Sequence, residues 1–275
     1  MTDKPRNPKM EGSACIDCRP QTGECPNNCS QCFYNRPGAF YCNIDEPQIP
    51  TMVEVGDKIV RMNSGHDSNL DKELVLAVAG HYPRVFFNTS MPDFDFPGPV
   101  VFTANAKEEE PAWCPIVNRG GKTRQLSPKK EAFCDRLMFV RLRVSPTNLG
   151  LIEHAVAAWT AKNVPVVLTF MAYYNQHPPG TEKSETDIRS SDCYWAPPYD
   201  LRMVAYTWRK RIINSYYCAT PRFETYVVQR MQKFGRTLVT MCGTLDGGKC
   251  RDCRNCETHF IQRAKYLSEK YNRVD

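Results

Sequence analysis

A nearly continuous run of apolar residues, Val164-Pro-Val-Val-Leu-Thr-Phe170, constrains the fold of this chain more than any other stretch. A short run of this kind is typical of a strand that is covered on both faces. Such strands belong to parallel sheets, because the helical crossovers of a parallel sheet lie over its faces. The run therefore predicts an α/β fold.

Similar segments recur along the chain and alternate with amphipathic segments. The other predicted strands are 58–62, 84–88, 100–105, 137–144 and 237–241. The predicted helices are 70–81, 149–162, 201–217 and 222–234, and a long polar insertion covers 175–200. About six strands alternating with helices predict a parallel sheet, curved or closed into a partial (β/α)6 barrel of the TIM type.

The length of 275 residues fits one large α/β domain with a short extension. We expect a polar leader over 1–19, the partial barrel over 20–241 and a cysteine-rich C-terminal region over 242–275. The chain has no run of eighteen apolar residues, and its first ten residues are polar. These features predict a cytoplasmic protein without a membrane span.

Fourteen cysteines in a chain without a secretion signal indicate metal binding rather than a disulfide framework. The most compact group is Cys25-Pro-Asn-Asn-Cys29-Ser-Gln-Cys32, whose proline and asparagines are turn formers. Thiolates are the usual ligands of iron-sulfur clusters, where four normally complete the shell. A set of three leaves one iron open to another ligand.

The spacing of Cys25, Cys29 and Cys32, followed by a predicted half-barrel, resembles the radical S-adenosylmethionine superfamily. The resemblance implies a [4Fe-4S] cluster on these three cysteines, with S-adenosylmethionine bound at the open iron. It also implies an external one-electron reductant, such as flavodoxin or ferredoxin. Reductive cleavage would then give a 5'-deoxyadenosyl radical that abstracts hydrogen from a substrate.

Two departures from the family pattern concern the residues around the cofactor. Gln31 precedes the third cysteine, where the family usually has an aromatic residue. Ser64-Gly65-His66-Asp67 stands where the family has Gly-Gly-Glu. Gly65 is expected to allow close backbone approach, and Asp67 to accept from the ammonium of the cofactor. Alternatively, Asp67 or Ser68 caps the following helix.

Chemistry in such barrels takes place where the strands end. Polar residues after the predicted strands are therefore candidates to bind the cofactor, and they include His66, Asn88, Ser145 and Asn148. Arg141 and Arg143 alternate along one strand. They point into the barrel unless its inner face carries Leu142 and Val144 instead. No catalytic residue is predicted.

A second cysteine set consists of Cys242, Cys250, Cys253 and Cys256. Its spacing resembles a ferredoxin run, and the superfamily often binds an auxiliary cluster in this position. A structural zinc is the alternative. For the first set the alternative is a zinc site that uses the Cys15-x2-Cys18 pair with two later cysteines. Cys15, Cys18 and Cys42 could supplement either site.

The sequence thus predicts a radical S-adenosylmethionine enzyme that acts on a small polar, nucleotide or nucleic-acid substrate. The net charge of +6 permits a substrate that carries phosphate. One alternative is a peptide-modifying or dehydrogenating enzyme in which the auxiliary cluster accepts an electron. Another is a zinc-binding module without catalytic activity that recognises nucleic acid, although no dense stripe of basic and aromatic residues supports it.

Overall fold

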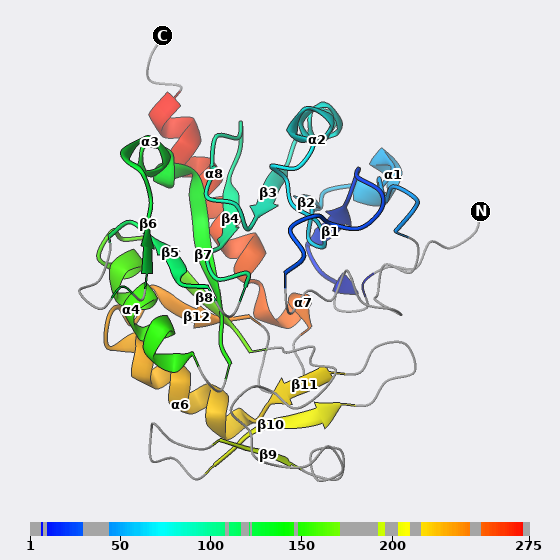
Figure 1. The fold of residues 1–275 in the computed structure, drawn as a ribbon. Helices are drawn as coiled ribbons and strands as arrows, with labels where there is room; N and C mark the ends of the chain where they lie inside the picture. The colour runs from blue at the N-terminus through cyan, green and yellow to red at the C-terminus, as the bar shows by residue number, and fades with distance from the viewer. Residues whose placement is uncertain are drawn as a thin grey trace.

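A computed structural model gives the fold of this chain, drawn in Figure 1. It describes residues 7, 10–29, 44–107, 110–116, 121, 123–145, 148–170, 192–195, 203–209, 216–242 and 249–271. Within this part of the chain, no helix is long and apolar enough to cross a membrane.

Seven strands form one parallel sheet at the centre of the molecule (Figure 1). In spatial order they are β1 (Cys15–Cys18), β2 (Ile59–Met62), β3 (Val85–Thr89), β4 (Val100–Thr103), β7 (Leu137–Arg143), β8 (Val166–Thr169) and β12 (Val239–Met241). All neighbouring pairs are parallel. The spatial order follows the chain order, so each crossover advances the chain by one position in the same direction. Right-handed crossovers then bring their helices to a single face.

The helices of the described chain are α1 (Met52–Val55), α2 (Lys72–Ala79), α3 (Pro128–Glu131), α4 (Leu149–Thr160), α6 (Pro221–Gln232), α7 (Cys250–Cys253) and α8 (Asn255–Tyr271), with a 3-10 turn at Cys134–Arg136. Helices α2, α4 and α6 pack on one face of the sheet and enclose the main core, whose largest buried side chain is Trp159. We call this the helix-covered face.

The opposite face of the sheet, which we call the open face, is covered at one end by α8. Phe260 of α8 packs in a second buried cluster with Phe86, Val101, Phe139 and Val167, which come from β3, β4, β7 and β8. In Figure 1, α8 (red) crosses the sheet close to β7. Because side chains alternate along a strand, the residues two positions further on also point to the open face.

Two smaller sheets accompany the main one. Strands β5 (Ala112–Cys114) and β6 (Thr123–Gln125) form a parallel pair beside α4. Strands β9 (Asp192–Trp195), β10 (Met203–Arg209) and β11 (Tyr216–Ala219) form an antiparallel sheet. The helix predicted over 201–217 is therefore wrong. The β-branched and aromatic residues of β10 favour a strand, which two antiparallel neighbours stabilise.

The predicted α/β class with a parallel sheet is confirmed. All six predicted strands are present, as β2, β3, β4, β7, β8 and β12. The seventh strand, β1, forms one edge of the sheet and lies within the segment 1–19 for which a polar leader is predicted. With β1 and β12 at its two edges, the sheet remains open within the described residues.

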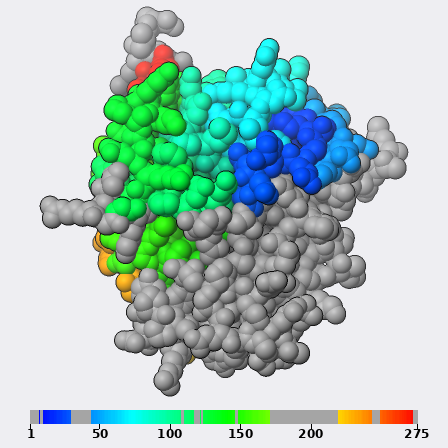
Figure 2. Space-filling view, in the orientation of Figure 1, coloured from blue at the N-terminus to red at the C-terminus, as the bar shows by residue number. Residues whose placement is uncertain are grey.

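The N-terminal segment lies beside the part of the chain that carries α1 and α2, and Figure 2 shows its surface (blue) against light blue and cyan. Backbone hydrogen bonds in both directions join Arg19 to Gln48. The side chain of Gln21 donates to the carbonyl oxygens of Asp67, at 3.2 Å, and Leu70, at 2.6 Å. The chain after β1 therefore lies against the connection that follows β2.

Candidate functional site

The segment that carries Cys25 and Cys29 lies where the strands end, beside the connections that follow β2 and β3. Cys25 is buried and Cys29 half-buried. The side-chain nitrogen of Asn27, between them, donates to Asp67 Oδ2 at 3.0 Å and to Ser90 Oγ at 3.1 Å. Three connections that are distant in the chain thus meet at Asp67.

The carboxylate of Asp67 is only 2% exposed and accepts hydrogen bonds on both oxygens. Oδ2 accepts from the backbone N–H of Ser90 at 2.6 Å, from Ser90 Oγ at 2.7 Å and from Asn27. Oδ1 accepts from Thr89 Oγ1 at 2.8 Å and from the N–H of Asn69 at 3.0 Å. These donors use both oxygens of the carboxylate, so the hydrogen bonds of Asp67 hold the three connections together. The contact with a cofactor ammonium stays a prediction.

Neither Asp67 nor Ser68 caps α2, so that alternative is wrong. The helix begins at Lys72, later than the sequence predicts, and Asp71 occupies the N-cap position without a capping hydrogen bond from its side chain. Asp71 adopts a left-handed conformation, which turns the chain sharply before the helix. Asp67, in the polar stretch before α2, therefore forms hydrogen bonds with the connections at the strand ends and does not cap the helix.

The other candidates in this region differ in their surroundings. Gly65 is buried and His66 is half-buried. Burial lowers the pKa of His66, which favours the neutral imidazole at neutral pH. Asn88 is buried on β3 and donates to the carbonyl oxygen of Met62 at 2.8 Å. Its Oδ1 atom is buried without a hydrogen-bond partner in the described part of the chain.

Ser145 and Asn148 lie together at the end of β7. Asn148 Oδ1 accepts from the N–H of Ser145 at 2.9 Å, and Asn148 Nδ2 donates to the carbonyl oxygen of Arg143 at 2.9 Å. Asn105, after β4, exchanges two hydrogen bonds with the backbone of Arg143, at 2.7 and 2.8 Å. These amides hold the strand ends in place, a role that the sequence does not distinguish from ligand binding.

A cavity of about 320 Å³ lies on the open face beside the cluster around Phe260, and Cys15, Phe139 and Val167 belong to both. The side chains of Cys15, Arg61 and Arg141 contribute to its wall from β1, β2 and β7. The second cysteine set lines the same cavity, through Cys242, Cys250, Cys253 and Cys256. The structure therefore gathers five cysteines and two strand arginines at one cavity.

Leu142 and Val144 belong to the core of the helix-covered face, so Arg141 and Arg143 point to the open face. This is the predicted alternative in which the two arginines face away from the helices. Arg141 lines the cavity. The guanidinium of Arg143 donates to the carbonyl oxygen of Ala106 at 2.5 Å and is thereby held at the strand ends.

Two opposing effects act on the thiols at the cavity, because the charge of Arg61 favours the thiolate whereas burial favours the neutral thiol. Arg61 forms a bidentate ion pair with Asp17 of β1, with Nε–Oδ1 at 2.6 Å and Nη2–Oδ2 at 3.1 Å. Burial raises the pKa of the Cys15 thiol to about 12 and that of Cys250 to about 11, while Arg61 lowers both. Burial also raises the pKa of Cys256, against the effect of Arg61 and Arg141.

Cys15 and Cys18 do not form the predicted zinc pair. They are three residues apart on a strand, so their side chains point to opposite faces. Cys15 faces the cavity, whereas Cys18 is fully buried in the core of the helix-covered face, where its thiol interacts with Tyr82. Cys32 and Cys42 lie outside the described residues.

The described cysteines do not converge closely. In the part of the chain that the structure describes, no three His, Cys, Asp or Glu side chains meet as a single metal ion requires.

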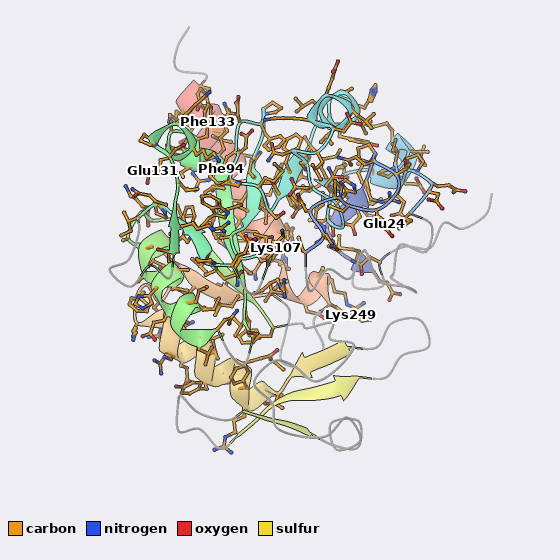
Figure 3. The ribbon with its side chains drawn as sticks, viewed as in Figure 1. Glu24, Phe94, Lys107, Glu131, Phe133 and Lys249 are labelled. Carbon is orange, nitrogen blue, oxygen red and sulfur yellow. The ribbon has the colours of Figure 1, made fainter. Side chains whose placement is uncertain are left out.

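Figure 3 shows Glu24, Lys107 and Lys249 on connections near the strand ends. Lys249, directly before α7, forms an ion pair with Glu11 at 3.6 Å.

No family model matches the chain, and no curated protein or solved structure is significantly similar to it.

Sequence reasoning missed Asn27, Asp17, Arg61 and the placement of Cys15. The signal for Asp17 and Arg61 is their position between apolar residues of short strands, where an alternating charge points to one face. Asn27 has no such signal, because its partners lie on connections that are distant in the sequence.

Proposed function

We propose that this chain is a radical S-adenosylmethionine enzyme whose [4Fe-4S] cluster is held by Cys25, Cys29 and Cys32. One observation carries the proposal: the segment with Cys25 and Cys29 follows the edge strand of a parallel sheet wound in chain order, and Asn27 fastens it to the strand ends. Active sites in parallel α/β folds lie at the carboxyl ends of the strands.

The open face of the sheet fits a bound polar cofactor or substrate. Asn88 Oδ1, Thr169 Oγ1 and Thr240 Oγ1 are buried without hydrogen-bond partners among the described residues. By strand alternation all three point to the open face, since Phe86 and Val167 do so. Buried polar atoms normally have partners, so this group favours a ligand that supplies them.

When bound, the cluster and S-adenosylmethionine supply one-electron cleavage of the sulfonium and a carbon radical that takes a hydrogen atom from the substrate. The chain itself holds and orients these groups. Asp67 and Ser90 fix the cysteine segment through Asn27. Arg61 and Arg141 provide positive charge on the open face, which supports a small anionic or nucleotide substrate.

A dehydrogenating reaction is a second candidate, because the C-terminal cysteines line the cavity on this same open face. Cys242, Cys250, Cys253 and Cys256 would hold an auxiliary cluster, which would supply an acceptor for the one electron that a substrate radical gives up together with a proton. The substrate of this version would be a peptide. The two candidates share the first cluster and differ in whether the second cluster changes its oxidation state during turnover.

The test is anaerobic reconstitution with iron and sulfide, reduction with dithionite and measurement of 5'-deoxyadenosine. Cys29→Ala should abolish formation of this product, because it removes a ligand of the first cluster. Cys134→Ala, a half-buried cysteine before β7, is the matched control and should retain it. Cleavage that survives in Cys29→Ala, or wild-type protein that binds zinc and cleaves nothing, would contradict the proposal.

A further inference from the structure

The cavity on the open face contains one cysteine more than a four-thiolate site requires. Cys242, Cys250, Cys253 and Cys256 already form a complete set by sequence, and Cys15 is the fifth thiol that lines the cavity. Cys15 is 227 positions or more from the others. Its presence results from the fold and not from a local motif.

The neighbourhood of Cys15 connects it to the C-terminal set. Cys256 packs against the buried cluster to which Cys15 belongs, and both thiols line the cavity. Cys242 and Cys250 line the same cavity. Cys29 lines a different pocket, together with Asn27 and Ser90, so Cys15 does not belong to the first cysteine site.

The fold brings the C-terminal thiols to this cavity in two ways. Arg254 has a left-handed conformation, with φ of 50°, which ends α7 after Cys253 and lets α8 begin in a new direction just before Cys256. The side chain of Asn255 donates to the carbonyl oxygen of Met241 at 2.6 Å. That hydrogen bond ties the start of α8 to the end of β12, directly before Cys242.

The shared cavity is compatible with a cluster as the bound group. A structural zinc holds its sulfur ligands at about 2.3 Å, so four thiolates must converge on one point. The described cysteines do not converge in this way, although they line a cavity of about 320 Å³. In a four-iron cluster each thiolate binds a different iron atom, so the ligands do not have to meet at one point.

We propose that Cys15 is a ligand of a [4Fe-4S] cluster in this cavity, together with cysteines of the C-terminal set, and that Arg61 and Arg141 offset its negative charge. The inference rests on the proposed function only in assigning iron-sulfur chemistry to the cysteines. Its consequence is that the second cluster is anchored to the open face of the sheet, and is not confined to a separate C-terminal unit.

The two arginines contribute differently. Arg61 is already neutralised in part by its ion pair with Asp17. Arg141 has no carboxylate partner in the described part of the chain, and its guanidinium lies 5.9 Å from the ring centre of Phe139. A positive charge without a partner stabilises the more negative, reduced state of a nearby cluster. Arg141 should therefore raise the reduction potential of the cluster.

Cys15→Ala and Cys15→Ser test the ligand assignment, with Cys18→Ser as the matched control on the same strand and the opposite face. After anaerobic reconstitution, wild type and Cys18→Ser should each hold about eight iron atoms per chain. Cys15→Ala should hold about four. Cys15→Ser, which nearly preserves the side-chain volume, should lose the same iron or keep it with a changed electron paramagnetic resonance spectrum.

A Cys15→Ser protein with wild-type iron content and an unchanged spectrum would overturn the ligand assignment, even if Cys15→Ala does not fold. Wild-type protein that holds one zinc and about four iron atoms would overturn the cluster assignment. Arg141→Leu should shift the potential of the second cluster to more negative values. The same shift in Arg143→Leu, or none in Arg141→Leu, would overturn the role of Arg141.

The failure of this inference differs from a failure of the proposed function. If the wild type holds about eight iron atoms but forms no 5'-deoxyadenosine, the radical chemistry is rejected and the site with Cys15 stands. If Cys15→Ser forms 5'-deoxyadenosine and binds both clusters as the wild type does, the proposed function stands and Cys15 is not a ligand.

Discussion

Replacement of Asp67 by Asn tests the role of this residue at the strand ends. The change keeps the size of the side chain but turns one acceptor oxygen into an NH2 donor. If the new amide oxygen replaces Oδ1, it can still accept from Thr89 and Asn69. The NH2 group then faces the N–H of Ser90 and the side-chain NH2 of Asn27, which are both donors.

The expected loss follows from these contacts. Ser90 Oγ can rotate and accept from the new NH2 group, so its contact survives. Two hydrogen bonds to the carboxylate are lost at a site that is only 2% exposed, and Asn27 Nδ2 keeps only its bond to Ser90 Oγ. Since a hydrogen bond to a charged group contributes about 1.5–3 kcal/mol, the free energy of unfolding should fall by about 3–5 kcal/mol. This is a large fraction of the stability of a typical domain, about 5–15 kcal/mol.

Urea unfolding, followed by circular dichroism, measures this loss. Asp93→Asn is the matched control, because Asp93 lies in the same connection as Ser90 but its side chain is 49% exposed and pairs only loosely with Lys72, at 3.5 Å. This control should change the free energy of unfolding by less than about 1 kcal/mol. Because Asn27 lies between Cys25 and Cys29, Asp67→Asn should also lower the iron content at the first site.

The opposite result would support the cofactor contact that the resemblance implies for Asp67. If Asp67 serves mainly to accept from a cofactor ammonium, Asp67→Asn should unfold at the wild-type urea concentration and raise the KM for S-adenosylmethionine. A loss of less than about 1 kcal/mol in the free energy of unfolding would therefore refute the loop-organising role.

Three further changes test the packing and charge of the described structure. Phe260→Ala should lower the free energy of unfolding by about 3–4 kcal/mol in urea, because the ring is buried against Phe86 at 6.3 Å between centres. A loss below 1 kcal/mol would mean that α8 does not cover the sheet. Asp17→Asn should cost about 3 kcal/mol by leaving Arg61 buried without its counter-charge, and a second change of Arg61 to Met should restore most of it. Burial raises the pKa of Glu224 to about 7, so the folded state holds this proton more tightly than the unfolded state does. The stability it contributes is complete below about pH 4.5 and lost as the pH rises through about 7. Glu224→Gln should remove this dependence, worth about 1–2 kcal/mol after screening by solvent, and an unchanged pH profile of unfolding would contradict the assignment.

The strands of the main sheet could be predicted because burial on both faces leaves a strong pattern. Val166 to Thr169 and Leu137 to Arg143 read as strands without any tertiary information. β1 could not be found in the same way. Its four residues include an aspartate and two cysteines, and only the pairing with β2 makes them a strand. The sequence pattern over 201–217 predicts a helix, but helix propensity is a weak signal. The pairing of β10 with β9 and β11 overrides it.

The candidate site was predictable to a smaller extent. The sequence identifies the two cysteine sets and the polar residues after the strands, because these are local features. It does not show that Asp67 faces Asn27 and Ser90, nor that Asn148 closes a turn, since side-chain partners across connections leave no periodic signal. The alternative that pairs Cys15 with Cys18 fails for a similar reason, because spacing alone does not reveal which face of a strand a thiol occupies.

The two faces of the sheet have separate tasks, and β7 shows this within seven residues. Val140 and Leu142 pack against the helices and contribute apolar burial, the main source of stability. Arg141 and Arg143 lie on the other face, where charges without water would be costly unless they are paired or meet a ligand. Arg143 is satisfied by a backbone carbonyl, whereas Arg141 faces a cavity lined by thiols. A sheet that needed only stability would place an apolar residue at 141, so the charge of the half-buried Arg141 supports the proposal that the open face binds a negatively charged group.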